Sequence, residues 1–460
     1  MSAPIPTSGS AVVYHWYNDH TKITGQSFMM RYNRLLAALV LVSTGCVVTS
    51  KTIDPTAELA EAKVRPGISV LLGDSIHLIR GKRIGLLTNQ TGINEKGVSD
   101  IDLLRSDKKA RAAGVSLVQL FSPEHGIRGT EDHENISNTV DAKTGLPIFS
   151  LYGRETTAPP DSMLRNLDAL VYDLQDIGTR TWTYVGAMIY SMRASARVHK
   201  PIIVLDRPNP ITGYIIEGPL LDPALANPED PTPERAGQAY ALYPMPLRHG
   251  MTMGEMALYF NDVLKIHADL HVVPVQRWRR DIWFDLTGLP WVKPSPNMPT
   301  LHSALLYPGL VAFEATNVSV GRGTPDAFQH VGAPWLNAAA TVAILKDREV
   351  PGVRFSVESF TPVNPTDQKY GGQTIPGIRI TVINRSAVQS ARVGATLLWA
   401  IRKTAGSKLT IDNRAFDLRF GSPRDREALL RGDDPDVLID REYKAAYAFR
   451  EATRQYLIYR

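Results

Sequence analysis

The chain has 460 residues, of which 43% are hydrophobic and 21% are charged, so it is long and apolar enough to bury the cores of two or three domains. Its net charge of +5 is small, and Lys and Arg are scattered along the sequence rather than gathered with aromatic residues into a basic stripe. We therefore expect no nucleic-acid partner.

The N-terminal region has the pattern of a bacterial export signal. Residues 30–34 (MRYNR) are basic, residues 35–42 (LLAALVLV) are apolar and too few to span a membrane, and residues 43–46 (STGC) are small. Cys46 is the only cysteine and stands where a lipoprotein carries its lipid, although Ser43 departs from the aliphatic residue usual at its place. We expect a periplasmic protein of the bacterial envelope, anchored to the membrane through lipid on Cys46, with plain cleavage as the alternative.

The sequence divides into five parts. Residues 1–28 lack signal character and are expected to precede the true start, residues 29–46 form the signal, and residues 47–65 form a polar tether. Residues 66–335 are expected to form a main domain of alternating strands and helices, and residues 336–460 a smaller α/β domain.

Four apolar runs of the main domain are predicted strands, and each gives way to a polar cluster. They lie at residues 82–88, 115–121, 167–172 and 201–205, and helices are expected at about 100–111 and 184–199. Alternation of this kind predicts an α/β fold, a mostly parallel sheet with helices on both faces. Because the carboxyl ends of parallel strands share one edge, the polar clusters should line a single crevice.

The second of these clusters concentrates the most chemistry. Residues 121–129 (FSPEHGIRG) hold a carboxylate, an imidazole and a guanidinium within five positions, between a proline and a glycine that shape the backbone. Glu124 and His125 are therefore candidates for work on a ligand. The competing interpretation is a solvated loop in which the two side chains only pair with each other. The crevice has neither the GxGxxG nor the GxxxxGK[ST] pattern, so no cofactor is expected.

The rest of the chain is less specific. Residues 219–246 are expected to form a long excursion, and Thr252 is a predicted helix N-cap with Glu255 three residues later. Beyond residue 335 we expect strands at 353–359 and 377–383 and helices at 390–403 and 440–459. The last helix carries aromatic residues, which we expect in the core or a domain interface rather than on a ligand surface. They are Tyr443, Tyr447, Phe449, Tyr456 and Tyr459.

Seven motifs occur in a fixed order along the chain. They are LTNQTG (87–92), SPEHG (122–126), DLQDIG (173–178), DRPNP (206–210), RHGMT (248–252), PSPNM (294–298) and FE followed by GRGT (313–324). The set resembles the exo-β-N-acetylmuramidase family of bacterial glycoside hydrolases over roughly residues 66–460. The resemblance implies a Rossmann-like catalytic domain with a smaller C-terminal domain, and release of N-acetylmuramic acid from the non-reducing ends of peptidoglycan fragments such as MurNAc–GlcNAc. It also implies that Glu124 is the leading catalytic carboxylate.

Glycoside cleavage needs an acid for the leaving oxygen and usually a second carboxylate. Asp173 and Asp176 are the first candidates for the second group, with Glu314 behind them. Asp173 has the alternative roles of a helix cap or a partner for Arg180. His125 either orients Glu124, contacts the sugar, or makes a purely structural hydrogen bond.

Muramic acid differs from glucosamine by an anionic lactyl ether, which the fork of an arginine would select. The candidates are Arg180, Arg207, Arg248 and Arg322, and the residues alone do not choose among them. Polar side chains in the same loops suit the hydroxyl and N-acetyl groups, although one or two are expected only to form turns. They are Asn89, Gln175, Asn209, His249, Asn297 and Asn317.

Two rival functions stay open at this point. Glu124, His125, Asp132 and His133 are residue types that hold Zn²⁺ in an amidase or deacetylase, although their spacing follows no common metal pattern. Alternatively the protein is a lipoprotein that binds muropeptides without turnover.

Overall fold

The computed structural model of the chain describes residues 63–128, 137–151, 158–227 and 240–460. The expected signal, Cys46 and nearly all of the expected tether lie outside these residues, as do residues 228–239 of the 219–246 excursion. None of the helices in the described ranges has the length and apolar character needed to cross a membrane.

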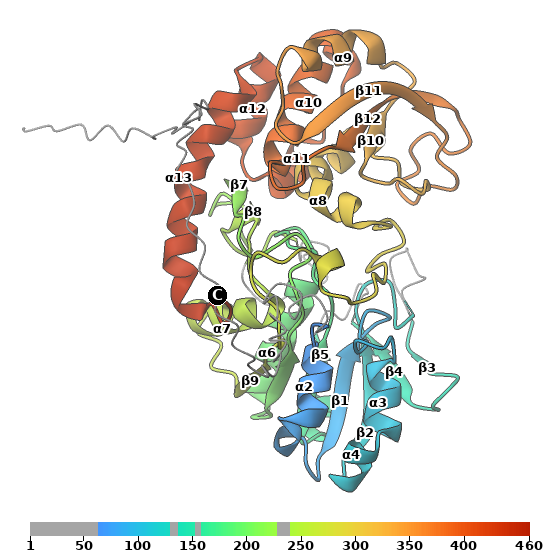
Figure 1. Cartoon of the computed structure of the whole chain (residues 1–460), viewed down its shortest axis with the longest axis vertical. Coiled ribbons are helices and arrows are strands. Elements are labelled where there is room, and N and C mark those ends of the chain that lie inside the picture. Colours follow the sequence, from blue (N-terminus) through green and yellow to red (C-terminus); the bar gives the residue numbers. More distant parts are fainter. Residues whose placement is uncertain (1–62, 129–136, 152–157, 228–239) are drawn as a thin grey trace, which may run out of the picture. The chain divides into compact units, whose positions relative to one another are not determined.

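A seven-stranded sheet forms the base of the described part of the chain, in the order β3-β4-β2-β1-β5-β6-β9 (Figure 1). Every neighbouring pair is parallel except β3 and β4 at one edge. The strands are β1 (Arg83–Thr88), β2 (Ser116–Ser122), β3 (Thr139–Val140), β4 (Pro147–Ser150), β5 (Ala169–Asp173), β6 (Ile202–Leu205) and β9 (Leu270–Val273). The expected α/β fold with a mostly parallel sheet is confirmed.

Both faces of this sheet are buried, which explains why its strands are continuously apolar. Along β5, Val171 packs into one core cluster and Leu170 and Tyr172 into another; along β6, Ile203 and Val204 divide in the same way. One face is covered by α2 (Gly67–Gly73), α3 (Asp100–Ser106) and α4 (Lys108–Ala112). The other is covered by α5 (Asp161–Arg165), α6 (Tyr184–Arg197) and α7 (Met253–Val263).

The single helix expected over residues 100–111 is wrong, because Asp107 divides it. Asp107 is extended, with φ −62° and ψ 139°, and its carboxylate accepts hydrogen bonds from the backbone N–H groups of Lys109 and Ala110. A carboxylate that can cap a new helix competes with continuation of the old one. The capping box predicted at Thr252 and Glu255 is present at the start of α7.

A second, smaller domain lies at the carboxyl ends of the strands (Figure 1). It contains a β7–β8 hairpin, an antiparallel sheet in the order β10-β12-β11, and helices around α10. The elements are β7 (Glu217–Leu220), β8 (Pro246–Arg248), β10 (His330–Gly332), β11 (Val353–Phe360), β12 (Ile375–Val382), α8 (Leu301–Leu310), α9 (Ala338–Lys346), α10 (Ser390–Ala405), α11 (Asn413–Phe420), α12 (Pro423–Arg431) and α13 (Pro435–Thr453).

Two glycines let α8 and α10 touch through their backbones. A Cβ on Gly309 would lie 1.7 Å from the carbonyl oxygen of Ser390, and a Cβ on Gly394 would lie 1.9 Å from that of Gly309. No larger residue fits at either place without moving a helix. The contact fixes α8, and the 3-10 helix η4 (Val311–Ala315) that follows it, onto the frame of the second domain.

The C-terminal aromatic residues divide between two environments. Phe449, Tyr456 and Tyr459 pack inward, where Phe449 and Tyr456 meet Tyr259 edge to face, as expected. The same expectation is wrong for Tyr443 and Tyr447, which are 61% and 53% exposed on the outer face of α13.

Candidate functional site

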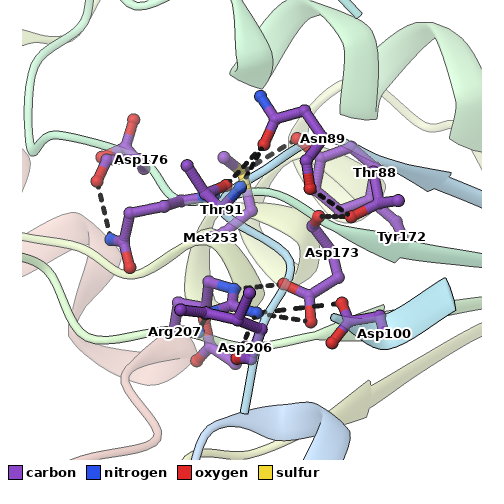
Figure 2. Close-up of polar contacts among 12 residues, drawn as sticks. Thr88, Asn89, Thr91, Asp100, Tyr172, Asp173, Asp176, Asp206, Arg207 and Met253 are labelled. Atoms are coloured by element: carbon purple, nitrogen blue, oxygen red, sulfur yellow. Dashed lines mark hydrogen bonds and ion pairs between the residues drawn. The ribbon is translucent and has the colours of Figure 1, made fainter. Parts of the chain in front are cut away.

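The loops after β1, β2, β5 and β6 meet at one edge of the sheet because these strands are parallel. The side chains at this edge are already connected: the Thr88 hydroxyl donates to the Asp173 carbonyl oxygen at 2.9 Å, and the Gln175 backbone N–H donates to the Thr91 hydroxyl at 3.1 Å (Figure 2). The predicted convergence of the polar clusters on one crevice is therefore present.

Glu124 is presented by a tight turn at the end of β2. The Gly126 N–H donates to the Pro123 carbonyl oxygen at 3.1 Å, and His125 and Gly126 have φ of 71° and 73°. Positive φ is unfavourable for a residue with a Cβ, and such strain concentrates where function requires a fixed backbone. The turn buries His125 and leaves Glu124 partly accessible to solvent.

The side chain of Glu124 is held by Thr183. The Thr183 hydroxyl donates to Oε2 of Glu124 at 2.5 Å. Thr183 is also the N-cap of α6, where a threonine oxygen usually accepts from the first turn of the helix, yet it makes no such bond here. The start of α6 thus directs both its hydroxyl and the positive end of its dipole toward Glu124.

Two aromatic residues beside Thr183 form a wall next to Glu124. The Tyr184 hydroxyl accepts from Asn89 Nδ2 at 2.8 Å and donates to the Pro294 carbonyl oxygen at 2.7 Å. The Trp182 ring meets the rings of Tyr184 and Tyr307 edge to face, with centroids 5.5 and 5.8 Å away. Its indole N–H is buried and has no hydrogen-bond partner within the described part of the chain.

Tyr307, on α8, joins Glu124 to a charged cluster of the second domain. Burial raises the pKa of the Tyr307 phenol; the carboxylates of Glu314 and Glu124 raise it further, whereas Arg322 and Arg419 lower it. A phenol that responds to all four charges shares one electrostatic neighbourhood with them. The charged cluster of the second domain therefore lies close enough to influence the same phenol as Glu124.

Glu314 lies between two arginines. Arg322 donates to Oε1 of Glu314 from Nε at 3.0 Å and from a terminal nitrogen at 2.5 Å, and Nε of Arg419 lies 3.5 Å from Oε2. Burial would raise the pKa of Glu314, but Arg322 and Arg419, with help from Lys369, outweigh it and hold the pKa below its usual value. Glu314 is thus a mostly covered carboxylate, with 12% of its side chain exposed, that is kept ionised.

Asp173 lies beneath the crevice in a buried ion pair. Arg207 donates to both of its carboxylate oxygens and to the Ile93 carbonyl oxygen, so the predicted alternative pairing with Arg180 is wrong (Figure 2). A second carboxylate, Asp100, lies 3.8 Å from Arg207 and has no hydrogen-bond partner among the described residues. Burial raises the pKa of Asp100 well above its usual value, Asp173 raises it further, and Arg207 lowers it.

Asp176 is also turned inward. Its Oδ2 accepts from the Gly178 backbone N–H at 2.6 Å and lies 3.3 Å from Nε2 of His249. His249 accepts from the Met251 N–H through Nδ1, which leaves the proton on Nε2, facing Asp176. The other oxygen of Asp176 is buried without a partner in the described structure.

Two of the candidate arginines, Arg180 and Arg248, bind other groups of the protein. Arg180 donates to the carbonyl oxygens of Tyr240, Leu418 and Arg419 and so connects the loop after β5 to α11; burial lowers its pKa to about 9. Arg248 is fully buried against the Glu217 carboxylate. Arg322 and Arg419 differ from them in that each side chain keeps 21% of its surface exposed.

Most of the candidate amides bind loop backbone. Asn89 accepts from the Thr91 N–H, Asn209 donates to the Met251 carbonyl oxygen, and Gln175 donates to the carbonyl oxygens of Asp176 and Pro208. Asn317 spans to the segment before α11 by a hydrogen bond to the Lys408 carbonyl oxygen. Asn297 is buried in the 294–298 loop.

Several neighbours of Glu124 escaped the sequence analysis. Trp182 and Thr183 directly follow the third polar cluster, and their place between a strand end and a helix start was a usable signal. Tyr307 and Arg419 come from helices of the second domain with no local motif, so only the fold brings them to the crevice.

The described residues contain no group of three or more His, Cys, Asp or Glu side chains placed to hold a metal ion. Asp132 and His133 of the rival zinc set lie outside the described residues.

A partly exposed carboxylate and an ionised one, both bordering an aromatic residue in a crevice at the carboxyl ends of a parallel sheet, are the groups a glycoside hydrolase uses. The family models for the N-terminal and C-terminal parts of exo-β-N-acetylmuramidase NamZ match residues 84–302 and 305–459. The chain belongs to this family of glycoside hydrolases, which confirms the resemblance seen in its motifs.

Individual relatives agree with this assignment. The chain is 36% identical over 426 residues to the peptidoglycan β-N-acetylmuramidase NamZ of Bacillus subtilis (strain 168), covering 92% of this chain and 98% of the relative. Crystal structures of two DUF1343 family proteins from Bacteroides fragilis NCTC 9343 are similar to it. One has a TM-score of 0.76 and 32% identity, covering 86% of this chain and 99% of the other. The second has a TM-score of 0.66 and 27% identity, covering 87% and 99%.

Proposed function

We propose that the protein is an exo-acting β-N-acetylmuramidase that hydrolyses the bond after a terminal, non-reducing N-acetylmuramic acid of peptidoglycan fragments. The observation that carries this proposal is the pair Glu124 and Thr183: a carboxylate at the end of a sheet strand, held by the N-cap residue of a helix. The B. subtilis relative is a peptidoglycan β-N-acetylmuramidase by name, and this chain matches nearly all of its length.

Glu124 is the acid that protonates the leaving glycosidic oxygen. Its partial exposure gives a substrate access, and the Thr183 hydrogen bond restricts its rotation, which is what proton transfer in a fixed geometry requires. We assign recognition of the N-acetyl carbonyl to the indole N–H of Trp182, which has no partner among the described residues and lies in the loop after β5.

Glu314 is the second carboxylate of the proposed mechanism. Arg322 and Arg419 keep it ionised. An ionised carboxylate can stabilise the positive charge that develops at the anomeric carbon, and it can either attack that carbon or activate a water molecule that does so. Asp173 and Asp176 are less suited: Asp173 has both oxygens on Arg207, and Asp176 lies against Gly178 and His249. We assign these two to support of the crevice loops.

Arg322 and Arg419 are the proposed recognition groups for the lactyl carboxylate. Lys369 adds a third cation to the cluster, near the carboxylates of Glu314 and Asp367. A sugar that brings its own carboxylate would be bound by the part of the two guanidinium groups that stays exposed. Arg180 and Arg248 are committed to internal partners and contribute to the frame instead.

An incubation with synthetic MurNAc–GlcNAc tests the function, with products identified by mass spectrometry. We expect free N-acetylmuramic acid and N-acetylglucosamine, formed equally well in the presence of a chelator. Intact disaccharide that is bound but never cleaved would leave a binding lipoprotein, and loss of activity on chelation would point to the metal-dependent alternative.

The proposed location is the periplasmic side of the envelope, with lipid on Cys46. The support is the order of basic, apolar and small residues over residues 30–46. Mass spectrometry of the mature N-terminus tests it: a lipid-free protein beginning elsewhere than Cys46 would exclude the anchor.

A further inference from the structure

The outer face of α13 gathers the exposed aromatic side chains of the described structure. The exposed large hydrophobic residues include three aromatic ones, Tyr214, Tyr443 and Tyr447, with exposed fractions of 61%, 61% and 53%. Tyr443 and Tyr447 are four residues apart on α13 and therefore lie on one helical face. A tyrosine with more than half of its surface in water contributes little to folding, so three together call for another explanation.

Arginines continue the same face. Arg450 lies three residues after Tyr447, and Arg454, directly after the end of α13, lies four residues after Arg450. The Arg450 guanidinium lies 5.3 Å from the ring centre of Tyr214. The Arg454 side chain is 80% exposed, and its ion pair with Glu451 is long, at 3.9 Å. We call Tyr214, Tyr443, Tyr447, Arg450 and Arg454 the α13 ridge.

A hollow of about 350 Å³ opens beside the ridge. Gly213, Met251 and Arg280 lie on one side of it and Tyr447, Arg450 and Arg454 on the other. Arg280 is neutralised by Glu255, at 2.6 Å, and Glu451, which also lines the hollow, offsets one of the two ridge arginines. Among the described lining residues one positive charge therefore remains. The volume is within the range of pockets that hold small ligands, about 300–1,000 Å³.

The ridge is separate from the crevice around Glu124. None of the residues that line the hollow belongs to the neighbourhood of Glu124, Tyr307 and Glu314. In Figure 1, α13 runs along the left of the view, while β2 and β4, whose ends border the crevice, lie at the lower right.

We propose that the α13 ridge is a second, non-catalytic binding site for the glycan strand of peptidoglycan from which peptides have been removed. The ridge combines the two features such a polymer requires. Tyrosine rings offer apolar faces to the C–H faces of pyranose rings and keep a hydroxyl for hydrogen bonding. The two arginines match the lactyl carboxylates, which recur on every second sugar of the strand.

The inference rests on the proposed function, because an exo-acting enzyme needs a way to stay on its polymer. The catalytic crevice takes the terminal sugar, and the strand beyond it remains unbound. A second site on the same molecule raises the effective concentration of chain ends near the crevice without new contacts to the reacting sugar. The ridge therefore affects the KM for long strands and leaves the turnover of a bound end unchanged.

The test compares two double variants of the full chain that remove the same charge. Arg450→Ala with Arg454→Ala removes both arginines of the α13 ridge. Lys108→Ala with Lys109→Ala removes two exposed lysines from α4, on the sheet domain. Binding is measured by co-sedimentation with purified peptide-free glycan strands, and activity with MurNAc–GlcNAc. We expect the ridge variant to bind strands at least roughly tenfold more weakly, with an equal rise in KM on strands, and to cleave the disaccharide as the wild type does. The lysine variant should match the wild type in all three.

Tyr447→Ser, tested in the same way, separates stacking from charge and should weaken strand binding while disaccharide cleavage is unchanged. Unaltered strand binding by both ridge variants would overturn the proposal. So would equal binding of the wild type to polyaspartate, which has carboxylates but no sugar rings, or ridge-dependent binding to phosphatidylglycerol vesicles in place of strands. Failure of the wild type to cleave the disaccharide would instead overturn the proposed function, since strand binding is measured without turnover.

Discussion

Thr183 turns its hydroxyl away from the helix that it begins and onto Oε2 of Glu124, at 2.5 Å. A hydroxyl that leaves its capping position gives up a stabilising contact worth about 1 kcal/mol, so the contact it makes instead marks Glu124 as the group whose position matters. The first prediction follows from this pair.

Thr183→Val keeps the shape of the side chain and removes its proton donor. Hydrogen bonds to charged groups are worth about 1.5–3 kcal/mol, so we expect kcat on a chromogenic β-N-acetylmuramide to fall by roughly ten- to a hundredfold. KM should change little, because Thr183 positions Glu124 rather than the sugar. Thr183→Ser restores the donor and should restore most of kcat. Equal losses in the Val and Ser variants would mean that packing, not the hydrogen bond, was responsible.

Glu124→Gln tests the acid itself. The amide has nearly the shape of the carboxyl but carries no transferable proton, and general acids contribute about 10²–10⁴-fold in rate. We expect turnover of the muramide to collapse by this amount, while the thermal unfolding midpoint and the affinity for N-acetylmuramic acid stay near those of the wild type. Steady-state kinetics with wild-type-like hydrolysis in the variant would remove Glu124 from the mechanism.

The sheet and its crevice could be predicted from the sequence because their signals are local. Continuous apolar runs such as residues 167–172 predict strands that are buried on both faces, and the polar residues directly after them indicate the edge of the sheet that borders the crevice. Glu124 belongs to this class, since its motif follows a strand. Arg419 does not, because α11 reaches the crevice only through the packing of the second domain.

The prediction failed where a pattern has two physical interpretations. Aromatic residues at helical spacing usually lie on a buried face but also occur on exposed ones, and Tyr443 and Tyr447 proved exposed while Phe449 did not. Burial depends on what the opposite surface presents, and β7, against which α13 packs, lies more than 200 residues away in the chain. The prediction of one helix over residues 100–111 failed for a similar reason, because a carboxylate such as that of Asp107 within a helical pattern can also cap the start of a new helix.

The pH dependence of stability should depend on the contact between Tyr459 and Asp206. The Tyr459 hydroxyl donates to Oδ2 of Asp206 at 2.6 Å, and burial raises the pKa of Asp206 to about 6, from an ordinary value of 3.8, against the lowering effect of this hydrogen bond. Because the folded state favours the protonated form, Asp206 stabilises the fold fully below pH 3.8, and that contribution is lost as the pH rises through about 6.

Tyr459→Phe removes a donor to the ionised form, so the pKa of Asp206 rises further and stability continues to fall above pH 6. We expect the variant to be less stable than the wild type by about 1.5–3 kcal/mol more at pH 7.5 than at pH 4.5, measured by urea unfolding. Tyr456→Phe is the control, because its hydroxyl contacts Asp262, an exposed carboxylate, and should give a small difference at both pH values. A Tyr459→Phe deficit that does not vary with pH would contradict the role given to Asp206.

The last prediction concerns the choice between muramic acid and glucosamine. Arg322 and Arg419 keep exposed surface beside an ionised Glu314, and Lys369 adds a third cation to the cluster. A sugar without the lactyl carboxylate cannot make charged hydrogen bonds to these arginines, so the wild type should cleave a chromogenic muramide and scarcely the matching glucosaminide.

Arg322→Met and Arg419→Met should each reduce the preference for the muramide over the glucosaminide, because cleavage of the muramide slows. For the residue that binds the lactyl carboxylate directly, we expect kcat/KM on the muramide to fall by roughly ten- to more than a hundredfold. Any effect through Glu314 slows both substrates alike, so the ratio of the two kcat/KM values isolates recognition from catalysis. Arg354→Met, on an exposed position of β11 in the same domain, loses the same charge and should leave the ratio unchanged. A wild type with equal rates on both sugars, or a ratio that neither Arg322→Met nor Arg419→Met alters, would show that selectivity for muramic acid does not reside in this cluster.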